Sequence, residues 1–210
     1  MKNIIFDLGD VIIPIDLRAP LRAFAQLANQ SEADMEALWK QHGIWQQHET
    51  GLIDDEAFRA AVRGLVRTKT DEPDRWADAI IDAAWNTVLL ELPVDRIERI
   101  KALQGKYRLF LLSNTNAIHI QEVDRRLAEL GQPPLESLFE QVFYSHIVRM
   151  VKPNPDIYRY VLETASLIPD ETVFLDDNPL NIRAAAALGI RAVQVVSPNT
   201  ILDYLDELGA

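Results

Sequence analysis

Short apolar runs that each end at a polar residue recur along the chain. They occupy residues 4–6, 109–112, 142–144, 173–175 and 192–196, and the polar residues that end them are Asp7, Ser113, Ser145, Asp176 and Ser197. Continuous apolar runs of this length are typical of parallel strands that are buried on both faces of a sheet. The pattern therefore predicts five buried strands, each followed by a polar side chain.

Helical patterns separate the later runs. Apolar residues recur every three or four positions over residues 93–104, and a second helix is expected over residues 116–130. Asn154-Pro155 and Asn178-Pro179 each place a capping residue before a proline, which is typical of the first turn of a helix. Strands that alternate with helices predict an α/β fold, a Rossmann-like doubly wound parallel sheet.

Residues 15–89 break this alternation, because they show helical patterns and no convincing strand. Helices are expected over residues 17–27, over 31–41 with Ser31 as the N-cap, from Asp54 or Asp55 through Leu65, and over 73–88. The sequence therefore predicts a core domain formed by residues 1–14 and 90–210. A small helical-bundle cap, residues 15–89, is inserted after the first strand.

Composition and charge limit the classes of partner. The 210 residues suffice for a core domain with a modest insertion, and 48% of them are hydrophobic, so a folded globular protein is expected. The formal net charge is −11, and the chain has no run of Lys and Arg. An acidic chain without a basic patch repels nucleic acid and anionic membranes, so we expect neither as a partner.

The chain contains no cysteine, which excludes disulfides, thiolate metal ligands and a cysteine nucleophile. The apolar run at residues 4–6 is too short for a signal peptide, and no long uncharged apolar stretch follows it. A cytoplasmic location is therefore expected.

The polar residues at the predicted strand ends form a candidate chemical site. Ligands of an open α/β sheet bind beyond the carboxyl ends of its strands, where Asp7, Ser113, Asp176 and Asp177 are expected to meet. A carboxylate can attack phosphorus, other carboxylates can hold Mg²⁺, and a hydroxyl and a lysine can neutralise phosphate oxygens. Carboxylates alone would repel a phosphate dianion, so the hypothesis requires both the metal and Lys152.

Each of these residues also has an ordinary structural interpretation. Asp7 could belong to a turn, Ser113-Asn114 could cap a helix, and Lys152 could be a solvated surface residue. Residues 176–178 could cap the following helix, although adjacent carboxylates at a buried strand end are costly without a cation. The conjunction of all four in this order is much more specific than any one of them.

Four motifs in this order resemble the haloacid dehalogenase-like hydrolases. They are Phe6-Asp7-Leu8-Gly9-Asp10-Val11, Leu112-Ser113-Asn114-Thr115, Lys152-Pro153-Asn154-Pro155-Asp156-Ile157-Tyr158 and Phe174-Leu175-Asp176-Asp177-Asn178. The resemblance covers essentially the whole chain, and the helical insertion stands where this family carries its smaller type of cap. The segment from Trp45 to Gly51 looks most like the branch that includes α-D-glucose-1-phosphate phosphatase.

The resemblance implies a magnesium site around the nucleophile. Asp7 would attack phosphorus and would also bind Mg²⁺. The backbone carbonyl of Gly9 would be a second ligand, and Asp177 a direct carboxylate ligand. Asp176 would lie nearby or act through a water molecule.

The resemblance also implies a substrate site. Ser113 and the amide of Asn114 would hold phosphate oxygens, and Lys152 would bridge the phosphate and Asp7. Further residues expected at the substrate are Asn116 from the core, and Trp45, His48 and Glu49 from the cap. Trp45 could equally belong to the core of the helical bundle, and a lone histidine such as His48 is more often structural.

Gly9 departs from the usual first motif, which has a second Asp two residues after the nucleophile as general acid and base. General acid catalysis contributes ~10²–10⁴-fold, so protonation of the leaving group is what this change affects. The sugar-phosphatase branch also has Gly at this position. Asp10 and His48 are candidate replacements. An anomeric oxygen also needs less protonation than an alkoxide, which favours glucose 1-phosphate over glucose 6-phosphate.

We therefore expect a Mg²⁺-dependent phosphatase that acts on a small phosphorylated metabolite. One alternative is a dehalogenase that uses Asp7 without a metal, which the pair Asp176-Asp177 disfavours. The other is a regulatory domain that binds phosphate without turnover, which Gly9 favours. A phosphatase assay with and without EDTA distinguishes the three.

Overall fold

The computed structural model describes residues 1–66, 76–207 and 209. Its centre is a parallel five-stranded sheet with the strand order β3-β2-β1-β4-β5. The strands are β1 (Asn3–Phe6), β2 (Arg108–Ser113), β3 (Gln141–Tyr144), β4 (Thr172–Asp176) and β5 (Arg191–Gln194). The predicted α/β class with a doubly wound sheet is confirmed.

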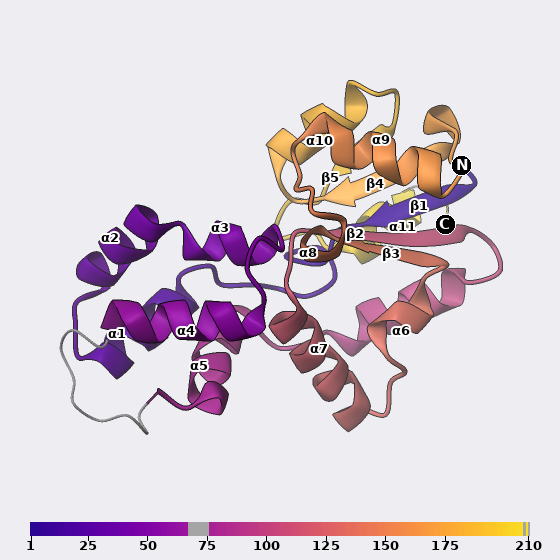
Figure 1. The fold of residues 1–210 in the computed structure, drawn as a ribbon. Helices are drawn as coiled ribbons and strands as arrows, with labels where there is room; N and C mark the ends of the chain where they lie inside the picture. Colours follow the sequence, from indigo (N-terminus) through magenta and orange to yellow (C-terminus); the bar gives the residue numbers. More distant parts are fainter. Residues whose placement is uncertain (67–75, 208, 210) are drawn as a thin grey trace.

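Helices cover both faces of the sheet (Figure 1). On one face, the helices α6 (Val94–Leu103), α7 (Ala117–Glu129) and α11 (Ile201–Glu207) pack in a hydrophobic cluster with Ile4 and Phe6. On the other face, α9 (Pro155–Thr164) and α10 (Pro179–Ala186) pack in a cluster with Ile5. Adjacent residues of β1 thus point into opposite layers, which is why its apolar run is continuous rather than alternating.

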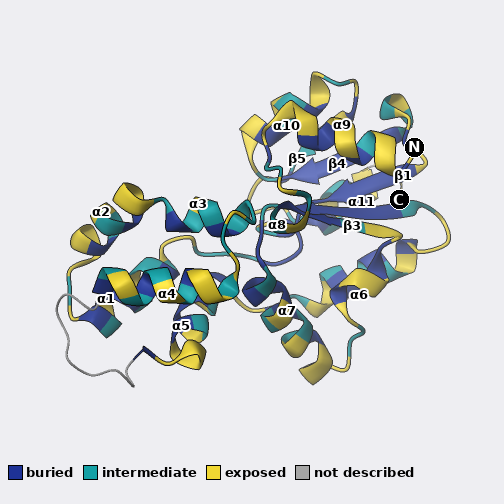
Figure 2. Ribbon diagram, in the orientation of Figure 1, coloured by how far each residue is buried: buried dark blue, intermediate teal, exposed yellow. Residues whose placement is uncertain are grey.

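Burial decreases from the middle of the sheet to its edge (Figure 2). Every residue of β1 and of β4 is buried, whereas none of β5 is fully buried. The prediction that the last strand reaches residue 196 was wrong by two residues. Pairing with β4 ends at Gln194, and Val196 is 50% exposed, so hydrophobicity alone misplaced the end of this edge strand.

The segment between β1 and α6 is helical, as its pattern predicted. It contains α1 (Ala19–Ala28), α2 (Glu32–His42), α3 (Ile44–Glu49), α4 (Asp55–Val66), α5 (Asp78–Trp85) and the 3₁₀ turn η2 (Asn86–Val88). The Ser31 hydroxyl accepts from the Asp34 N–H at 3.1 Å, so Ser31 is the N-cap of α2. The six-residue helix α3 was not predicted, and residues 73–75 of the predicted fourth helix lie outside the described residues.

The inserted helices bury a hydrophobic cluster of their own, which includes Phe24, Trp39, Phe58 and Trp85. Aromatic rings fill it, and the Trp39 and Trp85 rings stack with centroids 5.5 Å apart. The chain enters and leaves the insertion side by side, because Ile15 and Leu89 form an antiparallel bridge. The domain boundaries at residues 14 and 90 stay a prediction.

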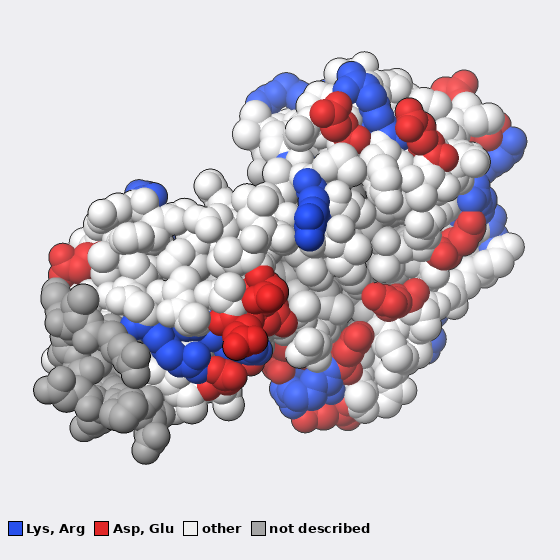
Figure 3. All heavy atoms as spheres, in the orientation of Figure 1, with Lys and Arg blue, Asp and Glu red and all other residues white. Residues whose placement is uncertain are grey.

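The remaining helical elements are short. They are η3 (Leu135–Leu138), α8 (Ser145–Val148) and η4 (Pro169–Glu171). Within the described ranges, none of the helices has both the length and the apolar character that crossing a bilayer requires. On the face drawn in Figure 3, acidic and basic side chains are interspersed over the described part of the surface.

Candidate active site

Three strand ends meet at one edge of the sheet. Phe6 of β1 is in register with Leu111 of β2 and Leu175 of β4, so the residues that follow lie next to one another. The Asp7 N–H donates to the Leu175 carbonyl at 2.9 Å and continues the ladder by one residue. Carboxylate oxygens of Asp7, Asp176 and Asp177 consequently lie within 4.8 Å of one another. The sheet register alone creates this concentration of negative charge.

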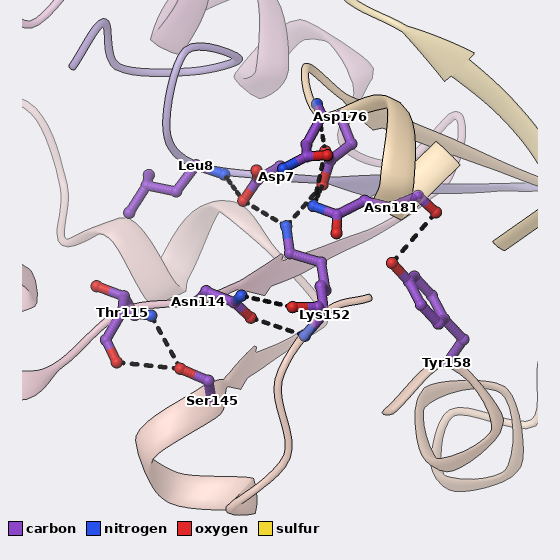
Figure 4. Close-up of polar contacts among 10 residues, drawn as sticks. Asp7, Leu8, Asn114, Thr115, Ser145, Lys152, Tyr158, Asp176 and Asn181 are labelled. Carbon is purple, nitrogen blue, oxygen red and sulfur yellow. Dashed lines mark hydrogen bonds and ion pairs between the residues drawn. The ribbon is translucent and has the colours of Figure 1, made fainter. Parts of the chain in front are cut away.

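Lys152 joins this cluster from the loop before α9. Figure 4 shows its ammonium group between two carboxylates, with Nζ 2.7 Å from Asp7 Oδ1 and 2.7 Å from Asp176 Oδ2. The Asn114 side chain fixes the backbone of the lysine from both sides. Its Nδ2 donates to the Lys152 carbonyl at 2.9 Å, and its Oδ1 accepts from the Lys152 N–H at 2.9 Å. This use of the Asn114 side chain leaves its backbone amide as the group that can contact a phosphate.

Asp176 is fully buried and saturated with hydrogen-bond donors. In addition to Lys152, it accepts from the Asn178 N–H at 2.8 Å and from Asn181 Nδ2 at 2.9 and 3.0 Å. Asp177 is half-buried and lines the adjacent cavity. Of the two adjacent carboxylates, Asp176 is therefore suited to position Lys152, and Asp177 is suited to bind a ligand.

The electrostatics of the site reflect an excess of negative charge. Burial raises the pKa of Asp7 to about 7; Lys152 opposes this shift and Asp176 adds to it. Burial also raises the pKa of Asp177. Burial acts to lower the pKa of Lys152, but the carboxylates of Asp7 and Asp176 outweigh it, so this pKa lies above its ordinary value. The lysine is a fixed cation facing more negative charge than it can balance.

The donor set fits a hard divalent cation. The three carboxylates face one ammonium group, and oxygen atoms are the ligands that Mg²⁺ prefers. The backbone carbonyl of Gly9 accepts no hydrogen bond from the described backbone outside helices and strands, so it is free to act as a ligand. An added cation would reduce the cost of burying these carboxylates.

A cavity of about 210 Å³ lies over these groups, between the sheet edge and the inserted helices. The core contributes Gly9, two apolar residues, Leu8 and Ile13, and a larger set of polar residues, which are Asp7, Ser113, Asn114, Thr115, His119, Lys152, Asp177, Asn178 and Asn181. Trp45 and Glu49 of α3 line the opposite side, together with Leu17. The structure thus places most of the sequence-predicted site residues in one cavity.

Two sequence-predicted substrate residues do not line this cavity. His48 is buried inside the helical bundle, where its Nε2 lies 2.8 Å from Asp55 Oδ1 and its ring stacks on Phe58. Asn116 is fully buried at the start of α7, where its Oδ1 accepts from the His119 N–H at 3.1 Å. Each side chain thus makes a contact inside the fold, and the prediction that these two residues contact substrate finds no support in the cavity lining.

Ile15 occupies the space beside Gly9. A Cβ atom placed on Gly9 would lie 2.9 Å from Ile15 Cδ1, so a larger residue there would require Ile15 to move. Asp10, the other acidic residue of this loop, does not line the cavity. Its Oδ1 accepts from the Ile15 N–H at 3.0 Å.

The sequence analysis named Ser145 as a strand-end residue but did not assign it to the site, and in the structure it connects the core to the inserted helices. Its hydroxyl accepts from the Thr115 N–H at 2.9 Å and lies 2.6 Å from the carbonyl oxygen of Glu49. Ser145 directly follows β3, so the strand-end rule that selected Asp7 and Ser113 could also have selected it. Its hydrogen bond holds the end of α3 over the cavity.

Gly51 permits a close approach between the end of α3 and α8. Its φ is +66°, and an added Cβ would lie 2.1 Å from the carbonyl oxygen of His146. We expect Gly51→Ala to destabilise the fold by roughly 1–3 kcal/mol. The substitution should also displace Glu49 and lower kcat/KM at least tenfold. Chemical denaturation measures the loss of stability, and phosphate release measures kcat/KM.

The matched control is Gly131→Ala. Gly131 has a similar φ of +69°, but an added Cβ there would meet nothing within 4 Å. Gly131→Ala should lower the free energy of unfolding only by the roughly 1–2 kcal/mol that a non-glycine residue costs in the left-handed conformation, and it should leave activity unchanged. Equal activity in the two variants would contradict the role given to the contact between Gly51 and α8.

Residues 1–189 match the family model described as haloacid dehalogenase-like hydrolase. D-ribitol-5-phosphate phosphatase of Bacteroides thetaiotaomicron is 29% identical over 209 residues, which cover 99% of this chain and 97% of that protein. Phosphorylated carbohydrates phosphatase of Thermotoga maritima is 29% identical over 101 residues, which cover 39% of this chain and 47% of that protein.

Solved structures give the same picture. The HAD family enzyme BT-2542 of Bacteroides thetaiotaomicron, in complex with magnesium and inorganic phosphate, superposes with a TM-score of 0.84 at 33% identity over 95% of this chain and 96% of that one. A predicted HAD-like family hydrolase of Porphyromonas gingivalis has a TM-score of 0.84 at 28% identity over 99% of this chain and 97% of that one. L-2-haloacid dehalogenase of Xanthobacter autotrophicus has a TM-score of 0.59 at 21% identity over 100% of this chain and 83% of that one, which shows the fold alone.

Proposed function

The chain belongs to the haloacid dehalogenase-like hydrolase family, and from this premise we propose that it is a Mg²⁺-dependent phosphatase with Asp7 as the nucleophile. The observation that carries the proposal is the position of Asp7. Its carboxylate ends the central strand, contacts Lys152 at 2.7 Å, and lies within a carboxylate cluster at the floor of a cavity. A nucleophile, a fixed cation and a set of oxygen ligands for a metal thus share one site.

In the first step, a carboxylate oxygen of Asp7 forms a bond to phosphorus as the bond from phosphorus to the leaving-group oxygen breaks. The Leu8 N–H at 2.6 Å and Lys152 Nζ both contact Oδ1, so Oδ2 is the oxygen left for attack. Water then attacks the phosphorus of the aspartyl-phosphate, and inorganic phosphate leaves as the Asp7 carboxylate is restored. Each step exchanges one phosphorus–oxygen bond for another.

Three groups of the core would hold the phosphate oxygens. They are the Ser113 hydroxyl, the Asn114 backbone N–H and the Lys152 ammonium group, which line the cavity beside Asp7. Lys152 is suited to this role because the two carboxylates keep its buried side chain charged. Donors fixed in advance stabilise the charge of the transferring group without having to reorganise.

Asp7, Asp177 and the Gly9 carbonyl would hold the magnesium ion, as the donor set permits. When bound, the ion supplies positive charge between the carboxylates and the phosphate dianion. Asp176 contributes indirectly, because its hydrogen bonds with Asn181 and Lys152 keep the lysine in place. The site residues therefore divide into those that touch substrate or metal and those that position them.

The substrate class that fits best is a small phosphorylated carbohydrate. The cavity of about 210 Å³ is smaller than a typical drug-sized pocket, and the inserted helices cover it. The names of two relatives specify ribitol 5-phosphate and phosphorylated carbohydrates. Glucose 1-phosphate stays a candidate on leaving-group grounds, and ribitol 5-phosphate is a candidate from the relative.

Metal removal is the first test of this function. We expect Mg²⁺ to support phosphate release from at least one of glucose 1-phosphate, glucose 6-phosphate and ribitol 5-phosphate. EDTA should lower the rate by at least about 100-fold, since the metal supplies several kcal/mol of charge stabilisation. The measurement is colorimetric phosphate release, with excess Mg²⁺ added back as the control.

The same assay separates the alternatives. Halide release from a 2-haloacid that EDTA does not affect would indicate a dehalogenase. Saturable binding of phosphate without turnover of any phosphomonoester would indicate a regulatory domain. Either result would overturn the proposed function.

A further inference from the structure

A proton donor for the leaving group is missing from the usual place in this site. The search for another proton donor rests on the proposed function, because a leaving-group proton matters only if a phosphomonoester is cleaved. Position 9 is glycine, Ile15 fills the adjacent space, and the Asp10 side chain is held outside the cavity. An alkoxide leaving group without an acid would lose ~10²–10⁴-fold in rate. Efficient cleavage of an alkyl phosphate therefore calls for another donor in the cavity lining.

The core side of the cavity does not offer one. Burial lowers the pKa of His119 to about 3, so its ring is neutral near pH 7, and its Nδ1 lies 2.8 Å from Asn86 Oδ1. Lys152 already donates to two carboxylates, and losing its proton would leave them uncompensated. Asp7 and Asp177 are the nucleophile and the proposed metal ligand. Among the described lining residues, this leaves a single carboxyl group, on the opposite wall.

That group is Glu49, the last residue of α3. Its backbone carbonyl lies 2.6 Å from the Ser145 hydroxyl, which ties this end of the helix to the core. Trp45, four residues earlier on the same helix, interacts with its carboxyl group and acts to lower its pKa. Glu49 lines the catalytic cavity together with Asp7 and Lys152. The contact with Ser145 fixes the backbone of Glu49 at the edge of this cavity.

Glu49 lies on the side where a leaving group must extend. The core groups bind the phosphoryl end, so the rest of the substrate points toward the inserted helices. Glu49, Trp45 and Leu17 also line a second cavity of about 540 Å³, so they lie where the two cavities adjoin. The leaving group of a bound phosphomonoester would therefore extend toward these three residues.

We propose that Glu49 is the general acid and base of this enzyme and replaces the aspartate that position 9 lacks. As the bond from Asp7 to phosphorus forms, the Glu49 carboxyl proton moves to the leaving-group oxygen, which departs as an alcohol. The Glu49 carboxylate then takes a proton from the water that attacks the aspartyl-phosphate. The cycle returns Glu49 to its acid form and requires no further reactant.

The protonation state of Glu49 agrees with this role. Burial raises the pKa of Glu49 to about 7, against the opposing effects of the Trp45 hydrogen bond and the Lys152 charge. A carboxyl group with this pKa can give and take a proton near neutral pH. The titratable and charged groups around it are Asp7, His119, Lys152 and Asp177 across the catalytic cavity, Arg18, Glu36 and Lys40 around the outer cavity, and His146 on the adjoining α8.

The test compares Glu49→Gln with wild type on two substrates. p-Nitrophenyl phosphate has a leaving group that departs without protonation, whereas glucose 6-phosphate releases an alkoxide. We expect Glu49→Gln to lower kcat for glucose 6-phosphate by about 10²-fold or more and kcat for p-nitrophenyl phosphate by less than tenfold. The matched control is Glu56→Gln, which changes an exposed glutamate of α4 outside the catalytic cavity and should leave both rates unchanged.

The pH profile gives a second readout that a purely structural role would not affect. In wild type, the ratio of kcat for glucose 6-phosphate to kcat for p-nitrophenyl phosphate should fall as pH rises above about 7, because Glu49 loses the proton it donates. Titration of Asp7 affects both substrates alike and cancels in this ratio. In Glu49→Gln the ratio should be low at every pH and should not vary with it.

The outcomes separate the role of Glu49 from the function on which it rests. If wild type releases phosphate from neither of these substrates and from neither glucose 1-phosphate nor ribitol 5-phosphate, the proposed phosphatase function fails. If wild type cleaves both and Glu49→Gln slows them equally, or slows neither, the phosphatase function stands and Glu49 is not the acid. A circular-dichroism melt of the variant checks that a loss for one substrate does not reflect unfolding.

Discussion

Asp7→Asn is expected to lower phosphate release by at least about 10³-fold while the protein stays folded. The amide cannot attack phosphorus, and loss of a nucleophile typically removes nearly all turnover. The fold should tolerate the change because Asn keeps an oxygen that can accept from the Leu8 N–H. The rate is measured with Mg²⁺ and the substrate that wild type cleaves fastest.

Stability should respond to Asp7→Asn in the opposite direction from activity. The folded-state pKa of Asp7 is raised to about 7, so above its unfolded pKa the ionised carboxylate disfavours the folded state. Replacing it with a neutral amide removes that cost, so in EDTA at pH 8 the variant should unfold at the same temperature as wild type or above it. A clearly lower melting temperature would show that the site does not carry the excess of negative charge inferred from its geometry.

Asp10→Asn is the matched control for the nucleophile. Asp10 is exposed, has a φ of +54° and uses its Oδ1 to accept from the Ile15 N–H, all of which Asn can reproduce. We expect near-wild-type activity. Substantial activity in Asp7→Asn, or an equal loss in Asp10→Asn, would exclude Asp7 as the specific nucleophile.

The second large effect is expected for Lys152→Met. Removing one partner of a buried charge cluster leaves the carboxylates of Asp7 and Asp176 uncompensated, which costs roughly 3–5 kcal/mol of unfolding free energy. The variant also loses a donor to the phosphate, so kcat should fall by about 10²–10³-fold. Urea denaturation at pH 8 in EDTA measures the first effect, and phosphate release measures the second.

Two conditions should partly restore the stability of Lys152→Met. Lowering the pH protonates the uncompensated carboxyl groups, and Mg²⁺ supplies positive charge to the same cluster. Lys106→Met, at an exposed lysine, is the control and should change the free energy of unfolding by less than about 0.5 kcal/mol. A Lys152→Met protein as stable as this control at pH 8 in EDTA would contradict the proposed charge balance.

Much of the catalytic side of the site could be predicted from the sequence, because it depends on strand ends. Asp7, Ser113 and Asp176 each end an apolar run, and parallel strands bring their carboxyl ends to one edge. The sequence could not show that Asp177 is half-buried and lines the cavity, or that Asp176 is fully buried and hydrogen-bonded, because two adjacent carboxylates look alike in a sequence. Asp176 differs from Asp177 because it is bonded to Lys152, which is distant along the chain, and to Asn181, which lies on α10.

The side of the site formed by the inserted helices was harder to predict, because helix packing decides it. His48 and Glu49 are neighbours in the sequence, yet His48 points into the bundle beside Asp55 and Glu49 lines the cavity. Both residues belong to α3, whose geometry points their side chains in different directions. This helix has only six residues, which is too few for a periodic pattern to be recognised in the sequence. The contact of Gly51 with His146, likewise, joins segments that no local pattern relates.

The most direct test of Asp7 as the nucleophile is to trap the covalent intermediate. Wild type is mixed with Mg²⁺ and a ³²P-labelled substrate, quenched in acid within one turnover, digested and analysed by mass spectrometry. We predict label on the peptide that contains Asp7, removal of that label by hydroxylamine, and no label in Asp7→Asn. Label on another residue, or label that persists in Asp7→Asn, would contradict the proposed mechanism.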